Sequence, residues 1–308
     1  MRITSANAFE TSLNNLQKRQ QALTQAQEQL TSGKRVLKPS DDPAAAAQAE
    51  RALARISRSE AQLRALDVSR NSMEMAESAL GHAGEMMQQA RELLVSAGNG
   101  SYNDSDRLAI AESIRGLRND LLTVANRTDG TGRYLFGGQG ASGMPLLDSP
   151  GGVAYAGSAG QSQAAAGEAS PLTIDGRAAW LQAPDPSSPG SSLSIFDAMD
   201  RVVAELMTPG RSAAAVALTV ADGLGDFDAG ADNLAAWRAR TGEALRRIDS
   251  IGERLSQTRL DAQTDRSEAE DLDMLQAISD FQNQQSGYDA ALKTYSIVQQ
   301  MSLLQYLK

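Results

Sequence analysis

Residues 30–48 read LTSGKRVLKPSDDPAAAAQ, and this stretch ends one helix and begins another. Gly33 suits the left-handed position that follows a helix, and Arg35 suits the negative end of the helix dipole. Asp42 can cap the free amide groups of a new helix, and Pro43 fits the first helical turn, where a missing N–H costs nothing. The stretch therefore predicts two separate helices, one on either side of it.

Before this boundary, seam residues recur at alternating steps of four and three, the heptad pattern of a coiled coil. They are Phe9, Leu13, Leu16, Gln20, Leu23, Gln27 and Leu30. Two of these positions are Gln, which weakens a helix–helix contact. We therefore expect this helix to be marginal alone and to be ordered by its neighbours.

After the boundary, a long helix is predicted from Pro43 to about Ala97, where Gly98-Asn99-Gly100 ends it. A new N-cap lies within residues 103–105, and the helix that follows should end near Gly130. The clearest seam of the long helix is Met73, Ala76, Leu80, Ala83, Met87, Ala90 and Leu94.

Helical spacing resumes at Ile195, stops at Pro209-Gly210, and continues from about Asp228 with little interruption to Leu307. We expect the two ends of the chain to share a self-assembly seam. Its residues are Phe9, Leu13, Leu16, Leu23, Leu30, Leu275, Ile278, Tyr288, Leu292, Tyr295, Val298, Met301 and Leu304.

The middle of the chain has a different composition. Residues 138–193 hold six of the nine prolines, ten of the 26 glycines and only five charged residues. Short strands are predicted at Val153–Tyr155, Leu172–Ile174 and Ala179–Leu181, between turn signals. The helical ends can meet only if this middle part loops out as an insertion.

The predicted fold is therefore mainly α, a long-helix coiled-coil bundle built from both chain ends with a small β-rich central insertion. We expect a terminal coiled-coil domain of residues 1–43 and 270–308, a helical bundle of 44–137 and 194–269, and an outward-facing insertion of 138–193.

Charge also pairs the two ends. Residues 1–40 carry six basic and two acidic groups, a net charge of +4, and residues 270–308 carry two basic and five acidic groups, a net charge of −3. Opposite charges help the terminal helices find each other, although each exposed ion pair adds little stability.

Overall composition excludes several classes of function. The net charge of −9 and the pI near 4.8 argue against a nucleic-acid partner, which requires a basic surface. The absence of cysteine excludes disulfides, thiolate metal sites and a Cys nucleophile. The sequence contains no run of about 18 apolar residues, so it predicts no membrane span. Its first residues do not resemble a cleavable secretion signal.

The sequence also offers little for catalysis, cofactors or metals. Residues 138–143 match G-x-G-x-x-G, but Met144-Pro145 follows where a dinucleotide site needs a helix, so a flexible hinge is favoured. His82 is the only histidine, lies in a helical seam and has no nucleophile motif nearby. We expect no cofactor, no metal site and no enzyme activity.

Three segments carry a resemblance to a known family. Leu30-Thr-Ser-Gly-Lys-Arg-Val, followed by Pro39-Ser-Asp-Asp-Pro-Ala, resembles the N-terminal signature of the bacterial flagellin family. Flagellins usually continue with Ala-Ala-Gly after the acidic pair, whereas this chain has Pro43-Ala44 and looks more like the hook-associated junction branch. The segments at 132–138, GRYLFGG, and at 194–200, SIFDAMD, resemble that branch as well.

That resemblance implies a structural subunit at the junction between the flagellar hook and filament. It implies assembly with itself into a ring or tube through the terminal helices, next to another hook-associated protein and flagellin. It also implies type III export without a cleavable signal, an extracellular location, and a cytoplasmic chaperone on the C-terminal region.

Two other functions stay open at this point. Flagellin itself, the filament subunit, is the first alternative. A secreted adhesin on a helical stalk is an alternative of another class, in which the central insertion would bind a ligand. An enzyme is the least favoured reading.

Overall fold

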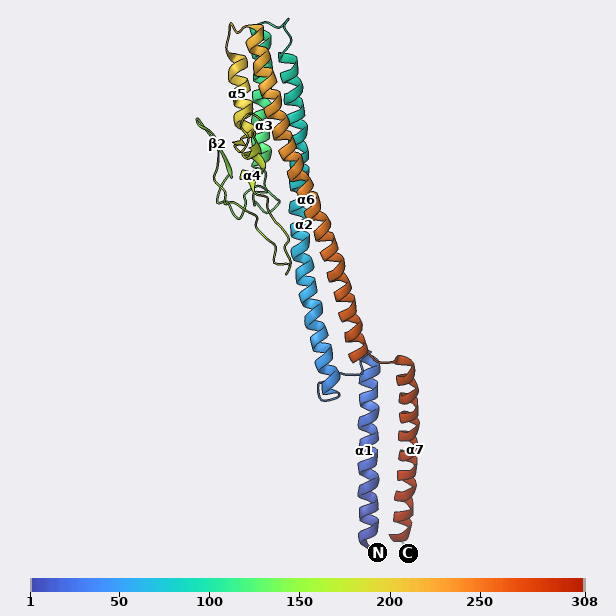
Figure 1. The fold of residues 1–308 in the computed structure, drawn as a ribbon. Coiled ribbons are helices and arrows are strands. Elements are labelled where there is room, and N and C mark those ends of the chain that lie inside the picture. The colour runs from blue at the N-terminus through green and yellow to red at the C-terminus, as the bar shows by residue number, and fades with distance from the viewer. Residues whose placement is uncertain (1, 307–308) are drawn as a thin grey trace. The chain divides into compact units, whose positions relative to one another are not determined.

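The computed structural model describes the backbone of residues 2–306 and the side chains of residues 10–297. This part of the chain is mainly helical, which confirms the predicted fold class (Figure 1). The helices are α1 (Arg2–Ser32), α2 (Pro43–Ala97), α3 (Asp104–Ala125), α4 (Gly176–Trp180), α5 (Ile195–Met207), α6 (Ala213–Glu270) and α7 (Met274–Tyr306).

The chain forms two compact units. The first combines Met1–Ser59 with Gln257–Lys308, and the second is Glu60–Ser256. In the first unit α1 lies beside α7, so the two ends of the chain pack together as expected (Figure 1). The finer division into three domains stays a prediction.

The second unit is built around the facing stretches of α2 and α6, with α3 and α5 packed against each other beside them (Figure 1). Arg238 Nε of α6 lies 2.6 Å from Glu77 Oε1 of α2, and Arg91 Nε lies 2.7 Å from Asp228 Oδ1. Seven residues of α2 confirm the predicted seam, each no more than 1% exposed: Met73, Ala76, Leu80, Ala83, Met87, Ala90 and Leu94.

Two predicted helix starts are confirmed by their capping hydrogen bonds. Asp42 Oδ1 accepts from the backbone amides of Ala44, at 3.2 Å, and Ala45, at 3.0 Å. Asn103 caps α3, and Asp106 completes the reciprocal pair by accepting from the amide of Asn103. The termini of α2 and α3 are thus fixed by local sequence.

The predicted course of the last helices was wrong at two places. Helix α6 begins at Ala213 rather than near Asp228, and its glycines mark close helix packing: a Cβ on Gly223 would lie 2.6 Å from Val202 of α5. The helix also stops at Glu270, and α7 starts after Asp273, whose carboxylate caps the amides of Leu275 and Gln276.

The central segment contains two small antiparallel pairs. Strand β1 (Leu146–Ser149) pairs with β2 (Gly152–Tyr155), and β3 (Ala183–Pro184) pairs with β4 (Ser192–Leu193). The predicted strand at Val153–Tyr155 is confirmed, whereas Leu172–Ile174 forms no strand. Ala179–Leu181 was predicted as a strand and instead falls in α4 and its C-cap, because Asp175 caps a helical turn there by accepting from Arg177 and Ala178 amides.

This central segment is packed into the core of the second unit. Trp180 is fully buried, contacts Phe136 edge-on with ring centroids 5.2 Å apart, and stacks on Phe196 of α5 at 6.1 Å. Asn233 and Trp237 of α6 donate to the carbonyl of Ala178, at 3.1 and 3.2 Å. The insertion is therefore anchored to the helices by apolar burial and hydrogen bonds.

Candidate functional site

The α1–α7 pair brings together part of the predicted self-assembly seam. Leu16, Leu23 and Leu30 of α1 are half-buried, and so are Tyr288 and Tyr295 of α7. The side chains of four other seam residues lie outside the described residues: Phe9, Val298, Met301 and Leu304.

The stripe of α7 that packs on α1 includes residues that the sequence analysis did not predict to lie in the seam. Phe281, Gln284 and Ala291 are half-buried and alternate with Tyr288 and Tyr295 at steps of three and four. Extending the heptad backwards from the two tyrosines would have found them. Gln284 is thus part of the packed stripe, whereas Gln20 and Gln27, which were predicted in the seam of α1, are exposed.

Three predicted seam residues of α7 lie on a different, exposed face. Leu275 is 85% exposed, Ile278 46% and Leu292 39%, and Leu13 of α1 is also exposed. A helix that is apolar on more than one face is normally covered on both. Within this chain, α1 covers one apolar face of α7 and leaves the other in solvent.

The signature stretch that opened the sequence reading joins the ends of three helices within the first unit. The amide of Arg35 donates to the carbonyl of Glu270 at 2.7 Å, and the amide of Leu272 donates to the carbonyl of Gly33 at 3.0 Å. Gly33 has φ +71°, the left-handed conformation that lets the chain turn out of α1. These hydrogen bonds join the C-terminal end of α1 to the turn between α6 and α7.

Charged side chains reinforce the joint. Arg35 donates to Asp42 Oδ2 at 3.0 Å and to the carbonyl of Ala269 at 2.9 Å, and Lys34 Nζ lies 3.1 Å from Glu270 Oε1. The pKa of Asp42 is lowered, first by the hydrogen bond from the Ala45 amide and then by Arg35. Asp42 therefore serves both as the cap of α2 and as the partner of Arg35.

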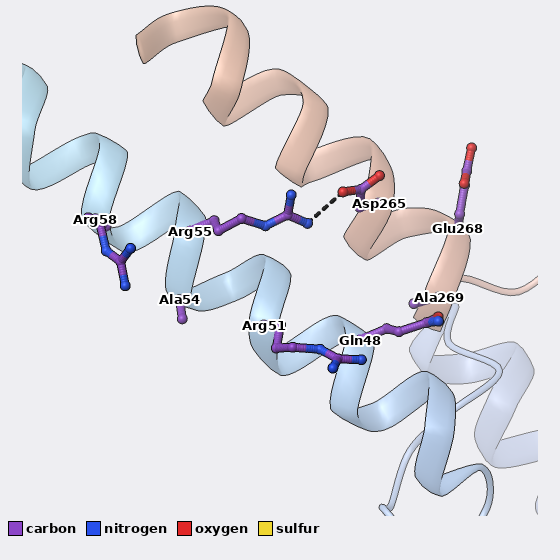
Figure 2. A pocket seen from close by; sticks show the side chains of 8 residues that line it. All are labelled: Gln48, Arg51, Ala54, Arg55, Arg58, Asp265, Glu268 and Ala269. Carbon is purple, nitrogen blue, oxygen red and sulfur yellow. Dashed lines mark hydrogen bonds and ion pairs between the residues drawn. The ribbon is translucent and has the colours of Figure 1, made fainter.

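A polar groove lies between α2 and α6 in the first unit, with a volume of about 780 Å³ (Figure 2). Arg51, Arg55 and Arg58 line it from α2, and Arg55 Nη2 lies 2.5 Å from Asp265 Oδ2 of α6. Figure 2 shows Glu268 of α6 directed away from α2. The groove is thus dominated by guanidinium groups.

The described residues show neither a cluster of metal ligands nor the turn into a helix that a dinucleotide site needs. They contain no group of three or more His, Cys, Asp or Glu side chains placed to hold a metal ion. The glycine run at 138–143 leads toward strand β1 and not into a helix, so it lacks the helix N-terminus of a dinucleotide site. None of the described helices is both long and apolar enough to span a bilayer.

Comparison with protein families gives two matches. The bacterial flagellin N-terminal helical region matches residues 3–141, and the bacterial flagellin C-terminal helical region matches residues 224–307. The two matched regions contain the helices of the first unit and leave most of the central segment outside.

Comparison with individual proteins gives relatives that align from end to end. Flagellar hook-associated protein 3 of Salmonella typhimurium is 29% identical over 99% of both chains, and that of Escherichia coli is 30% identical over 91% of this chain and 92% of its own. Flagellins of Listeria and Salmonella align over only 37–39% of this chain. A crystal structure of Xanthomonas campestris FlgL shares the fold with a TM-score of 0.60 at 22% identity, over 70% of this chain and 98% of its own.

Proposed function

The chain belongs to the bacterial flagellin family, in its hook-associated protein 3 branch, and is a structural component of the flagellar hook–filament junction; we propose that it assembles there through its paired terminal helices. The observation that carries this function is the end-to-end alignment with hook-associated protein 3, whereas the flagellins align over only 37–39% of the chain. The resemblance read from residues 30–44, 132–138 and 194–200 is confirmed at the level of this family.

The assembly mechanism follows from the uneven burial of α7. Its stripe through Tyr288 and Tyr295 packs on α1, while Leu275, Ile278 and Leu292 stay exposed. Covering that second face with a neighbouring copy would bury apolar area and drive ring or tube formation. The polar Gln284 in the packed stripe of α7 keeps the pair weak in the free chain, so the terminal helices gain their full order only on assembly.

The partners in this proposal are other copies of the chain, the neighbouring hook-associated protein, and flagellin. Before export, a cytoplasmic chaperone would cover the exposed apolar face of α7, because such a face promotes aggregation in a free protein. The protein acts without catalysis, in agreement with the structural flagellar proteins among its relatives.

The alternatives are weaker on specific grounds. Flagellin is disfavoured because the flagellins align with little more than a third of the chain. An adhesin on a stalk would need a ligand site in the central segment. There the large apolar side chains, such as Trp180, are buried against α5 and α6 instead of lining a pocket.

Electron microscopy of a deletion strain tests the proposal directly. Cells that lack the protein should carry hooks without filaments and should release flagellin into the medium. Expression of the full chain should restore filaments, and expression of a chain truncated after Leu272 should not. Normal filaments in the deletion strain would refute the junction function, and lost surface adhesion with normal swimming would favour the adhesin.

A further inference from the structure

The turn after α2 contains the one asparagine of this chain that a glycine follows directly, Asn99-Gly100. This turn joins α2 to α3 at one end of the second unit (Figure 1). Asn99, Gly100 and Ser101 are all exposed, and a Cβ added to Gly100 would meet nothing within 4 Å. The main chain of the turn is therefore open to solvent, and no side chain shields the amide nitrogen that follows the asparagine.

Hydrogen bonds hold the side chain of Asn99 over the main chain that follows it. The amide of Ser101 donates to Asn99 Oδ1 at 3.1 Å, and the amide of Tyr102 donates to the main-chain carbonyl of Asn99 at 3.0 Å. The first bond closes an Asx turn, in which the side-chain carbonyl folds back across the next peptide group. The amide of Gly100 donates to no acceptor among the described residues, so no hydrogen bond restrains its nitrogen.

This turn places an amide nitrogen beside an electrophilic carbon. When the Gly100 nitrogen loses its proton and attacks Asn99 Cγ, a cyclic imide forms, and ring closure is favoured because both atoms belong to the same turn. Negative charge develops on Asn99 Oδ1 during the attack. The amide of Ser101 already donates to that oxygen and therefore stabilises the charge.

We propose that Asn99 is a site of spontaneous deamidation in the folded chain. A bond forms between the Gly100 nitrogen and Asn99 Cγ, the Cγ–Nδ2 bond breaks, and the side-chain nitrogen leaves as ammonia with the proton from the Gly100 amide. Water then opens the imide. Opening at Cγ leaves aspartate at position 99, and opening at the main-chain carbonyl leaves isoaspartate. The reaction depends on this turn and not on assembly of the chain.

Either product places a carboxylate beside the C-terminal end of α2. The amides of Gly98 and Asn99 donate to the carbonyls of Val95 and Ser96, at 3.2 and 3.0 Å, so this turn covers the last carbonyls of the helix. An anion is unfavourable there because the C-terminal end of the helix dipole is negative. Isoaspartate also adds a methylene group to the main chain between α2 and α3. The modification therefore loosens the turn.

Asn103 provides a control within the same stretch of chain. Its Oδ1 accepts from the amide of Ser105 at 2.8 Å, the same contact that Asn99 makes with Ser101, and Asn103 is also exposed. The residue after it is Asp104, whose Cβ crowds the nitrogen that would attack. Comparing the two asparagines therefore separates the effect of the glycine from that of the Asx turn.

Mass spectrometry of the full chain tests the proposal. The purified protein is incubated at mildly alkaline pH, which favours deprotonation of the attacking amide. Trypsin then releases residues 92–107 as one peptide that carries both asparagines. Asn99 should be converted to the acid at least about tenfold faster than Asn103. Aspartate and isoaspartate should appear together, because a cyclic imide opens at both carbonyls.

Gly100→Ala is the variant that blocks the reaction with the least change. Gly100 does not have a positive φ, and a Cβ there has free space, so the chain should fold as wild type, which chemical denaturation checks. The methyl group hinders the attacking nitrogen and should slow the conversion of Asn99 at least about tenfold. Gly116→Ala, at an exposed glycine of α3 where a Cβ also meets nothing within 4 Å, should leave the rate unchanged.

The charge of the product is tested separately. In Asn99→Asp, amides of the last turn of α2 should exchange about threefold faster than in freshly prepared wild-type chain. Equal exchange would overturn the effect on α2. Intact Asn99 after incubation, equal conversion of Asn99 and Asn103, or an undiminished rate in Gly100→Ala would overturn the modification site itself. Aspartate without isoaspartate would do so as well, because it would show direct hydrolysis instead of ring closure.

Discussion

The two units of this protein differ in how completely they bury their apolar side chains. In the second unit Phe136, Trp180, Phe196 and Phe227 are at most 1% exposed. In the first unit, no residue of α1 or α7 whose side chain is described is fully buried. The second unit therefore has a core of its own, whereas the terminal pair needs further contacts to become equally stable.

The difference also separates two uses of an apolar residue. Leu275 and Trp180 are both large and apolar, yet one is 85% exposed and the other fully buried. Buried residues stabilise the chain that carries them, whereas an exposed one adds stability only when a further contact covers it.

The largest expected effect comes from truncating a large side chain in the core of the second unit. Trp180→Ala should lower the free energy of unfolding of that unit by about 3–5 kcal/mol, through lost burial and the cavity left behind. Chemical denaturation, followed by the fluorescence of Trp237, measures it. Leu275→Ala, the matched change in the first unit, should alter stability by less than about 0.5 kcal/mol. Equal costs for the two variants would contradict the comparison.

Hydrogen exchange should show the same contrast without any mutation. In the free monomer, amides of α1 and α7 should open with a free energy at least about 3 kcal/mol below that of the facing stretches of α2 and α6, roughly a hundredfold faster exchange. On assembly the protection of α1 and α7 should rise. Equal protection of both units in a verified monomer would show that the terminal pair is already stable.

A smaller effect concerns the ion pairs that hold the central segment in the second unit. Arg118, 5% exposed, donates to Asp148 of β1 at 2.7 Å and to Asp200 of α5 at 2.9 Å. The hydrogen bonds from Arg118 lower the pKa of Asp148 below its usual value. Asp148→Asn should therefore destabilise the second unit at pH 7 by about 1 kcal/mol, read as a fall in Tm of about 2–4 °C.

The direction of the pKa shift determines how the contribution of Asp148 to stability changes with pH. Because the folded pKa of Asp148 is lowered, its stabilising contribution is present above the unfolded pKa and is lost as the pH falls through the folded value. Asp226 is the opposite case, since burial raises its pKa. Its contribution is complete below the unfolded pKa and is lost as the pH rises, so Asp226→Asn should raise Tm at pH 7. A fall in Tm for both variants would show that the pair with Arg201 outweighs the burial of Asp226.

The sequence predicted the parts of this structure that local patterns determine. The seam from Met73 to Leu94 and the caps at Asp42 and Asn103 follow from spacing and side-chain chemistry within a few residues. The burial of Trp180 was not predictable in that way, because it depends on Phe136 and Phe196, which are distant in sequence. Such contacts leave no periodic signal.

The assembly surface was predicted only in part, for a related reason. Helix α7 is apolar on two faces, so a single period could not separate the stripe packed on α1, with Tyr288, from the exposed one, with Leu275.

The smallest expected effects come from two glycines with the same left-handed backbone conformation, one in each unit. Gly33, in the joint of the first unit, has φ +71°, and Gly210, in the second, has φ +74°. A Cβ would meet nothing within 4 Å at either position, so replacement by Ala costs only the backbone strain, about 1 kcal/mol. Gly210→Ala should lower the unfolding free energy of the second unit by that amount.

Gly33→Ala should leave the unfolding of the second unit unchanged and act on the first unit instead. Strain at the end of α1 weakens the hydrogen bonds that join it to Glu270 and Leu272, so amides of α1 should exchange about fivefold faster, the equivalent of about 1 kcal/mol. Asn tolerates the left-handed conformation better than Ala, so Gly33→Asn is the matched control and should restore most of the protection. If Gly33→Ala instead lowered the unfolding free energy of the second unit as much as Gly210→Ala does, the two units would unfold as one. The contrast in burial would then have no counterpart in stability.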